Sequence, residues 1–201
     1  MELEIKGLHV HRDGKSLIRD FSLIAETGKI TCLQCESALW PIVSRTILGL
    51  QPMEKGYISF DGELLTTKSA PYFRRQIAYL PQDLRLSYET LGELLDVFCR
   101  MKVNGEKKLR KSAILEAIGL DENAGDTPLK DISYIELRMI LLRVLRLQQR
   151  PIMLVEGWNG NDDELTLLRA IADEQTTVVV NCSKAVESAK INQIVVLNPQ
   201  E

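Results

Sequence analysis

The sequence predicts an α/β domain built around a mostly parallel β-sheet. Short apolar segments typical of buried strands recur along the chain, and segments whose apolar residues have helical spacing lie between them. This alternation predicts strands joined by helices that cover both faces of one sheet. With 201 residues, of which 45% are hydrophobic, the chain is long enough to bury a core in one domain without disulfides or metal ions.

The first half of the chain predicts two strands, then a buried strand that leads into a helix. The third strand is short and apolar and follows Gly28, which breaks the chain before it. A helix is expected from about Leu39 to Leu48, because Gly49 then ends the pattern. Strands are expected at residues 3–10, 16–24, 29–33, 56–60 and 76–80.

The second half predicts a helical stretch, followed by more strands and helices in alternation. Apolar residues spaced three or four apart between Thr90 and Gly125 predict a helical subdomain at about residues 86–132. Ser133 is a suitable N-cap for the next helix, and Glu136 completes a capping-box pattern. Further helices are expected at 133–147 and 164–172, and strands at 151–155, 177–180 and 194–197.

Charge and hydropathy exclude several classes of function. The formal net charge of −3 gives no reason to expect nucleic acid as a partner. No apolar run approaches the roughly 18 residues that a membrane-spanning helix needs. The N-terminus carries the acidic residues Glu2 and Glu4 and lacks the basic start of a signal peptide. We therefore expect a cytoplasmic protein.

The four cysteines fit a reducing compartment, in which most cysteines are small buried hydrophobic side chains. Cys32 and Cys35 form a C-x-x-C pattern, which is also found in redox and zinc sites. Cys32 lies inside an expected apolar strand, however, and no second cysteine or histidine pair completes four zinc ligands. Redox or metal function is the weaker interpretation, and no metal site is expected.

Residues 78–82, Ala-Tyr-Leu-Pro-Gln, cover the end of an expected strand and a glutamine that follows it. Taken in order with this segment, six others resemble one known family: 3–8, 17–23, 48–50, 56–62, 159–162 and 194–197. That family is the nucleotide-binding domain of ABC transporters, the ATP-binding cassette, in which a strand similar to 78–82 leads into the Q-loop glutamine. The resemblance spans nearly the whole chain and implies one P-loop NTPase-like domain over residues 1–201. Such a domain has a mostly parallel sheet, an N-terminal antiparallel β part and an inserted helical subdomain.

The phosphate loop of that family, G-x-x-x-x-G-K-[ST], joins a strand to a helix and binds the phosphates of ATP. Counted back from Gly49 without gaps, the matching positions include Gln34, Ser37, Ala38, Leu39, Trp40, Pro41 and Ile42. Gln34 and Leu39 replace the glycines, and Leu39 brings a Cβ where a positive φ is expected. Trp40 replaces the lysine without supplying a charge. Pro41 replaces the hydroxyl residue and has no N–H.

Binding of ATP and Mg²⁺ at this loop is therefore expected to be weak or lost, although the positive end of the helix leaves a weak anion site open. Gln82 corresponds to the Q-loop glutamine, which helps to place Mg²⁺ and water; a surface glutamine after Pro81 is nearly as good an interpretation. Glu156 stands where the general base is expected, but Val155 replaces the aspartate that binds Mg²⁺.

The remaining functional positions of the family also match only in part. Ser133 corresponds to the signature-loop serine, but Tyr134 and Ile135 follow it in place of glycines. Asp162 matches the D-loop aspartate, and Cys182 replaces the switch histidine. The aromatic residue that stacks on adenine should lie near Arg12 or its neighbour His11, either of which could cover a purine.

These replacements lead to the hypothesis of a pseudo-ATPase: a cassette subunit of an ABC transporter with a structural or regulatory role. Its expected partners are a membrane-spanning permease subunit and a second nucleotide-binding domain, on the inner face of the membrane. One alternative is a divergent but active ATPase that energises transport, with Glu156 as base and Gln82 as metal ligand. Another is a protein-binding or small-molecule-binding α/β module descended from the family.

Overall fold

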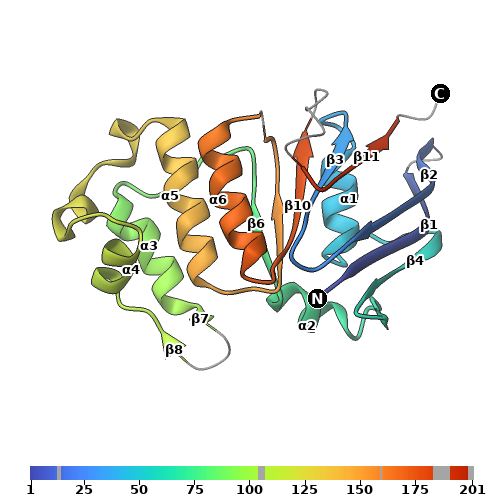
Figure 1. Ribbon diagram of the computed structural model, residues 1–201, viewed down its shortest axis with the longest axis horizontal. Coiled ribbons are helices and arrows are strands. Elements are labelled where there is room, and N and C mark those ends of the chain that lie inside the picture. The colour runs from blue at the N-terminus through green and yellow to red at the C-terminus, as the bar shows by residue number, and fades with distance from the viewer. Residues whose placement is uncertain (13–14, 104–106, 159, 183–190, 199–201) are drawn as a thin grey trace. The chain divides into compact units, whose positions relative to one another are not determined.

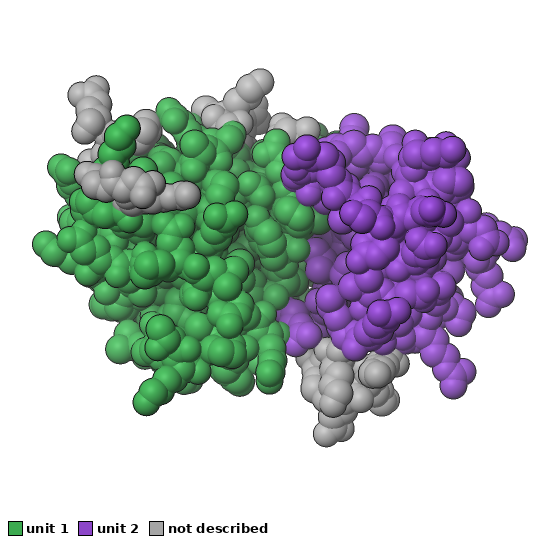
Figure 2. Space-filling model, turned by 180° about the vertical axis from the view of Figure 1, so that it is seen from behind, with its two compact units in different colours: residues 1–82, 151–201 green, residues 83–150 purple. Residues whose placement is uncertain are grey.

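The computed structural model describes residues 1–201 except 13–14, 104–106, 159, 183–190 and 199–201. The chain forms two compact units, which Figure 2 shows in different colours. The first unit combines Met1–Gln82 with Pro151–Glu201, and the second is Asp83–Arg150. Both larger sheets lie in the first unit, whereas the described part of the second unit is mainly helical.

An antiparallel sheet of four strands, in the order β2-β1-β4-β5, forms one part of the first unit. Its strands are β1 (Leu3–Arg12), β2 (Lys15–Ala25), β4 (Lys55–Phe60) and β5 (Glu63–Leu64). In the register, Ile5 of β1 lies opposite Leu23 of β2 and Ile58 of β4. These three side chains are buried, as the alternating pattern of a half-exposed sheet requires. The N-terminal antiparallel part implied by the sequence is confirmed.

A parallel sheet of five strands, in the order β11-β3-β10-β9-β6, forms the other part. Its strands are β3 (Ile30–Cys35), β6 (Ile77–Leu80), β9 (Ile152–Val155), β10 (Thr177–Cys182) and β11 (Gln193–Leu197). Every residue of β9 and β10 is buried, which explains why β9 is a continuous apolar run and why β10 contains three consecutive valines. The predicted α/β class with a mostly parallel sheet is confirmed.

The helices of the first unit are α1 (Trp40–Ile47), α2 (Ala70–Arg75) and α6 (Asp162–Asp173). One core cluster contains buried residues from α1, α2 and both sheets, so α1 packs where the two sheets share a core (Figure 1). Within it, the rings of Phe60 and Phe73 stack with their centres 4.3 Å apart. This shared core fixes the position of the strand–turn–helix segment from β3 to α1.

The second unit contains α3 (Leu91–Arg100), α4 (Lys111–Ala117), α5 (Tyr134–Leu147) and two short 3-10 helices, Glu122–Asp126 and Leu129–Asp131. Ser133 caps α5, because its Oγ accepts a hydrogen bond from the Glu136 N–H at 3.2 Å. The predicted N-cap is thus confirmed. The expected helical pattern is interrupted by a pair of two-residue strands, β7 (Lys102–Val103) and β8 (Lys107–Lys108), because Met101 adopts an extended conformation that ends α3.

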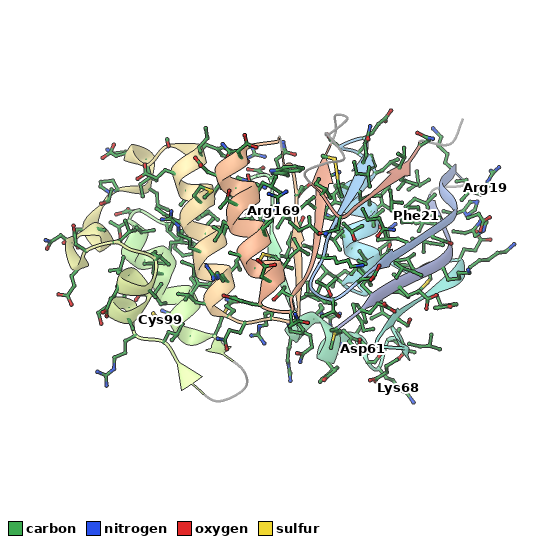
Figure 3. All side chains as sticks on the ribbon, viewed as in Figure 1. Arg19, Phe21, Asp61, Lys68, Cys99 and Arg169 are labelled. Carbon is green, nitrogen blue, oxygen red and sulfur yellow. A yellow bond between two sulfur atoms is a disulfide. The ribbon has the colours of Figure 1, made fainter. Side chains whose placement is uncertain are left out.

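A disulfide joins Cys32 of β3 to Cys182 of β10, across two neighbouring parallel strands (Figure 3). The expectation that these cysteines are only buried hydrophobic side chains is wrong for this pair, since strand pairing brings together residues 150 positions apart. Cys35 is a free, buried thiol, so the two cysteines of the C-x-x-C pattern are not bonded to each other.

Two glycines with positive φ offer a matched test of the antiparallel sheet. A Cβ added at Gly56, where φ is +88°, would lie 2.3 Å from the carbonyl oxygen of Gly7; one added at Gly62, where φ is +80°, would meet nothing within 4 Å. We expect Gly56→Ala to lower the free energy of unfolding by about 3 kcal/mol or more and Gly62→Ala by about 1 kcal/mol, as measured by urea unfolding. Equal losses would contradict the close packing of Gly56 on β1.

Candidate functional site

The turn that joins β3 to α1, together with its flanking residues, contains the residues that the sequence matched to the phosphate loop. Gln34 and Cys35 remain in β3, with Gln34 in register with Cys182 of β10 and Val196 of β11. Only a short turn then precedes α1, and the Leu39 N–H closes it by donating to the Glu36 carbonyl at 2.9 Å. This N–H therefore points into the turn, whereas a phosphate loop directs its N–H groups at the ligand.

Leu39 has a right-handed helical conformation, with φ −85° and ψ −32°. The resemblance places a glycine that needs a positive φ at this position, and the backbone at Leu39 does not adopt that conformation. The turn follows a path that suits an ordinary side chain, and the Leu39 side chain is buried in the core. Ser37 and Ala38, the two residues before it, are exposed at the tip of the turn.

Trp40 is the first residue of α1, and its side chain is fully buried in the core of the first unit. Pro41 follows in the first turn of the helix, where a missing N–H costs no intrahelical hydrogen bond. Ile42 packs against the same core, with its N–H bonded to the Leu39 carbonyl at 3.0 Å. These residues begin a helix and fill a core, and none of them supplies a cation for a phosphate group.

Glu156 follows β9, and its carboxylate accepts two hydrogen bonds from the segment that ends β6. The Tyr79 hydroxyl donates to Oε2 at 2.8 Å, and the Gln82 backbone N–H donates to the same oxygen at 3.2 Å. The Glu156 N–H in turn donates to the Leu80 carbonyl at 2.9 Å. The structure therefore brings together Glu156 and Gln82, the two predicted catalytic candidates.

Gly157 allows the Gln82 side chain to lie directly against the backbone after Glu156. Its φ is +69°, and a Cβ at this position would lie 2.7 Å from the Cγ and Cδ atoms of Gln82. A residue with a side chain would have to displace the glutamine or strain the turn. Gly157 is thus a spacing residue for the pair Glu156 and Gln82, which the sequence analysis missed.

Tyr79 is a second residue that sequence reasoning missed. Its burial, and then its hydrogen bond to Glu156, raise the pKa of the Tyr79 hydroxyl to about 12, while Ser44 and Trp40 of α1 act in the opposite direction. In the parallel register, Tyr79 lies opposite Leu154, two residues before Glu156. That pairing is the signal that could have identified Tyr79, but it requires knowing that β6 and β9 are neighbours.

The end of β10 lies beside the turn formed by residues 156–158. The Asn181 carbonyl accepts a hydrogen bond from the Trp158 N–H at 2.9 Å. The Asn181 side chain, which is buried, donates from Nδ2 to Cys35 Sγ at 3.2 Å and to the Leu33 carbonyl at 3.4 Å. Burial raises the pKa of the Cys35 thiol to about 11. Cys182, which stands at the switch-histidine position, is held in the disulfide and does not titrate.

The other candidate residues belong to other elements. Arg12 is the last residue of β1 and its side chain is outside the described part; its neighbour His11 forms an ion pair with Glu54. Ser133 belongs to the second unit, and Asp162 is the first residue of α6, after the N-cap Asn161. Among the described residues, no group of three or more His, Cys, Asp or Glu side chains could hold a metal ion, and none of the helices is long and apolar enough to cross a membrane.

Comparison with known proteins gives local sequence matches and matches of the whole fold. No family model matches the chain. An uncharacterised ABC transporter ATP-binding protein of Haemophilus influenzae is 35% identical over 83 residues, which are 41% of this chain and 32% of that protein. MntB of Listeria innocua, a manganese transport system ATP-binding protein, is 35% identical over 81 residues, 40% of this chain and 32% of that protein. The chain thus spans about a third of the length of the curated relatives it matches.

Solved structures resemble the chain over almost its entire length. The structure of cbiO1 from Clostridium perfringens, part of the ABC transporter complex cbiONQ, has a TM-score of 0.76 at 14% identity and covers 99% of this chain and 86% of its own. A putative ABC transporter ATP-binding protein from Pyrococcus furiosus has a TM-score of 0.73 at 18% identity, with 98% of both chains covered. The fold is therefore that of P-loop NTPases. The curated relatives and these neighbours are all described as ABC transporter proteins, and the chain resembles them in a local stretch of sequence and in fold, as the sequence suggested.

Removing the Tyr79 hydroxyl should show how much the bond to Glu156 contributes. We expect Tyr79→Phe to lower the free energy of unfolding by about 1 kcal/mol at pH 7. The folded state raises the pKa of Tyr79 from 10.0 to about 12, so its contribution is full below pH 10.0 and is lost as the pH rises towards 12. The difference between wild type and variant should therefore shrink over that interval in urea unfolding. Tyr72→Phe, at an exposed tyrosine, is the matched control and should show no such change. If the difference in unfolding free energy between wild type and Tyr79→Phe stayed constant from pH 10 to pH 12, the role assigned to the Tyr79 hydroxyl would be contradicted.

Proposed function

We propose that this protein is a cassette subunit of an ABC transporter whose own nucleotide site is inactive, so that it acts as a structural or regulatory pseudo-ATPase. The observation that carries the proposal is the turn before α1, which is closed on itself and followed by the buried side chain of Trp40. In a working site the same segment surrounds phosphate groups with N–H donors and a lysine.

The missing contacts determine how much affinity is lost. A hydrogen bond between a charged donor and a phosphate contributes about 1.5–3 kcal/mol. Replacing the lysine by Trp40 and a donor N–H by Pro41 removes about 4 kcal/mol in total, which corresponds to a loss of affinity of about a thousandfold. The inward-facing N–H of Leu39 adds to this loss. Glu36 also places a negative charge at the turn, where a triphosphate would be repelled.

Glu156 has a structural role in this proposal. Its Oε2 already accepts hydrogen bonds from Tyr79 and from the Gln82 N–H, which ties the end of β9 to the end of β6. A general base must be able to reach a water molecule that is itself positioned by a metal ion or a phosphate. Val155 supplies no carboxylate for Mg²⁺, so Glu156 lacks the neighbour that would make it useful as a base.

The proposed partners are a membrane-spanning permease subunit and a second nucleotide-binding domain, with the protein in the cytoplasm on the inner face of the membrane. The cbiO1 protein is part of the transporter complex cbiONQ, and MntB is the ATP-binding protein of a manganese transport system. An assembly of the same general kind is proposed for this chain by analogy. The proximity of Glu156 and Gln82 favours a second candidate, a divergent ATPase that uses these two residues.

Nucleotide titration separates the two candidates. We expect calorimetry with Mg-ATP to give a Kd above about 1 mM for the purified protein, because the phosphate contacts are missing. An ABC ATP-binding domain with an intact phosphate loop serves as the positive control in the same buffer. Micromolar binding would overturn the proposal. Steady ATP turnover that is lost in the variant Glu156→Gln would establish the divergent ATPase instead.

A further inference from the structure

The disulfide between Cys32 and Cys182 lies in the interior of the parallel sheet. Cys32 of β3 is in register with Val180, and Cys182 is the last residue of β10, so the bond crosses diagonally between the two strands. Both cysteines are essentially unexposed, at 0% and 1%. The bond joins the last residue of β10 to Cys32, three residues before β3 ends at Cys35.

The end of β10 also holds the turn that carries Glu156. The carbonyl of Asn181, one residue before Cys182, accepts the Trp158 N–H at 2.9 Å. The Trp158 side chain is buried and follows Gly157, against which Gln82 packs. A continuous series of contacts therefore runs from the disulfide through Asn181 to the residues around Glu156.

We propose that Cys32 and Cys182 form a redox-sensitive latch. When oxidised, it holds the end of β10 and, through Asn181, the turn formed by residues 156–158. Closing it removes two electrons and two protons from the thiols, and an acceptor disulfide such as oxidised glutathione becomes two thiols. Opening it reverses this exchange, with a dithiol as the electron donor and its cyclic disulfide as the product.

Opening the latch requires a thiol from outside the chain and a local opening of the strand end that exposes the sulfur atoms, because both cysteines are buried. Cys35 is the nearest free cysteine in sequence, but it is three residues from Cys32 and so lies on the other face of β3, where its thiol contacts Asn181. Its raised pKa of about 11 also leaves little thiolate to attack a disulfide near pH 7. The other free cysteine, Cys99, belongs to the second unit. Thiol–disulfide exchange with Cys35 therefore does not break the bond between Cys32 and Cys182.

Two observations favour a switch over a permanent cross-link. In reducing compartments, disulfides occur mainly in transient, catalytic or redox-sensing roles; this point rests on the cytoplasmic location proposed above. The contacts of Asn181 give the bond a defined local consequence, since they connect it to one turn of the candidate site. The mechanical part of the proposal rests on those contacts alone and does not depend on whether the site binds nucleotide.

The test compares the purified chain of 201 residues after treatment with oxidised glutathione and with dithiothreitol. Alkylation in denaturant followed by intact-mass measurement should find two of the four cysteines free in the first sample and all four in the second. Reduction should lower Tm by about 5–10 °C, because the closed loop is long. It should also accelerate hydrogen exchange of the Trp158 amide by about tenfold, while peptides from α4 should not change.

Variants distinguish the latch from a general loss of stability. Cys182→Val should resemble the reduced protein under both conditions and lose its response to dithiothreitol, whereas Cys99→Ser should respond like wild type. Four free thiols after oxidation would overturn the proposal. A Tm shift with unchanged amide hydrogen exchange at residues 156–158 would also overturn it, since the bond would then stabilise the fold without affecting the site. Neither result bears on nucleotide affinity, so a failure here is distinct from a failure of the proposed function.

Discussion

The burial of the Trp40 side chain at the start of α1 determines the geometry of the candidate site. A large apolar ring at this position must enter the core that α1 shares with both sheets, and it is fully buried there. The turn between β3 and α1 is short, and the Leu39 side chain at its end is buried in the same core. Trp40 and Ser44 of α1 also interact with Tyr79, whose hydroxyl donates to Glu156. One buried start of a helix therefore lies next to both the closed turn and the tyrosine that binds the carboxylate.

The fold could be predicted from the sequence largely because its strands are strongly marked. The β10 strand begins with four β-branched residues, 177–180, and is buried throughout, and β9 is an apolar run. The N-cap Ser133 was equally clear, since Glu136 three residues later completes a local pattern. The interruption by β7 and β8 was missed because helical spacing of apolar residues extends to both sides of it and hides a short break.

The candidate site could be predicted only where its chemistry is local in sequence. The replacements at Leu39, Trp40 and Pro41 are visible in one stretch, but the path of the turn depends on what Trp40 packs against. The role of Tyr79 depends on β6 lying next to β9, and the bond between Cys32 and Cys182 depends on β3 lying next to β10. Such pairings join residues that are far apart in the chain, so their partners could not be deduced from spacing alone.

The replaced residues also make the closed turn stable without a ligand, which bears on the proposed function. A phosphate loop directs its N–H groups outward and is completed by phosphate or water, whereas here Leu39 and Ile42 use their N–H groups within the turn and the helix start. To reopen the loop, a nucleotide would have to withdraw Trp40 from the core, and exposing an indole ring of that size costs about 3–5 kcal/mol. That cost adds to the missing phosphate contacts. In the pseudo-ATPase proposed here, the closed turn is therefore the working geometry, and any change of state has to enter through another part of the first unit, such as the disulfide at the end of β10.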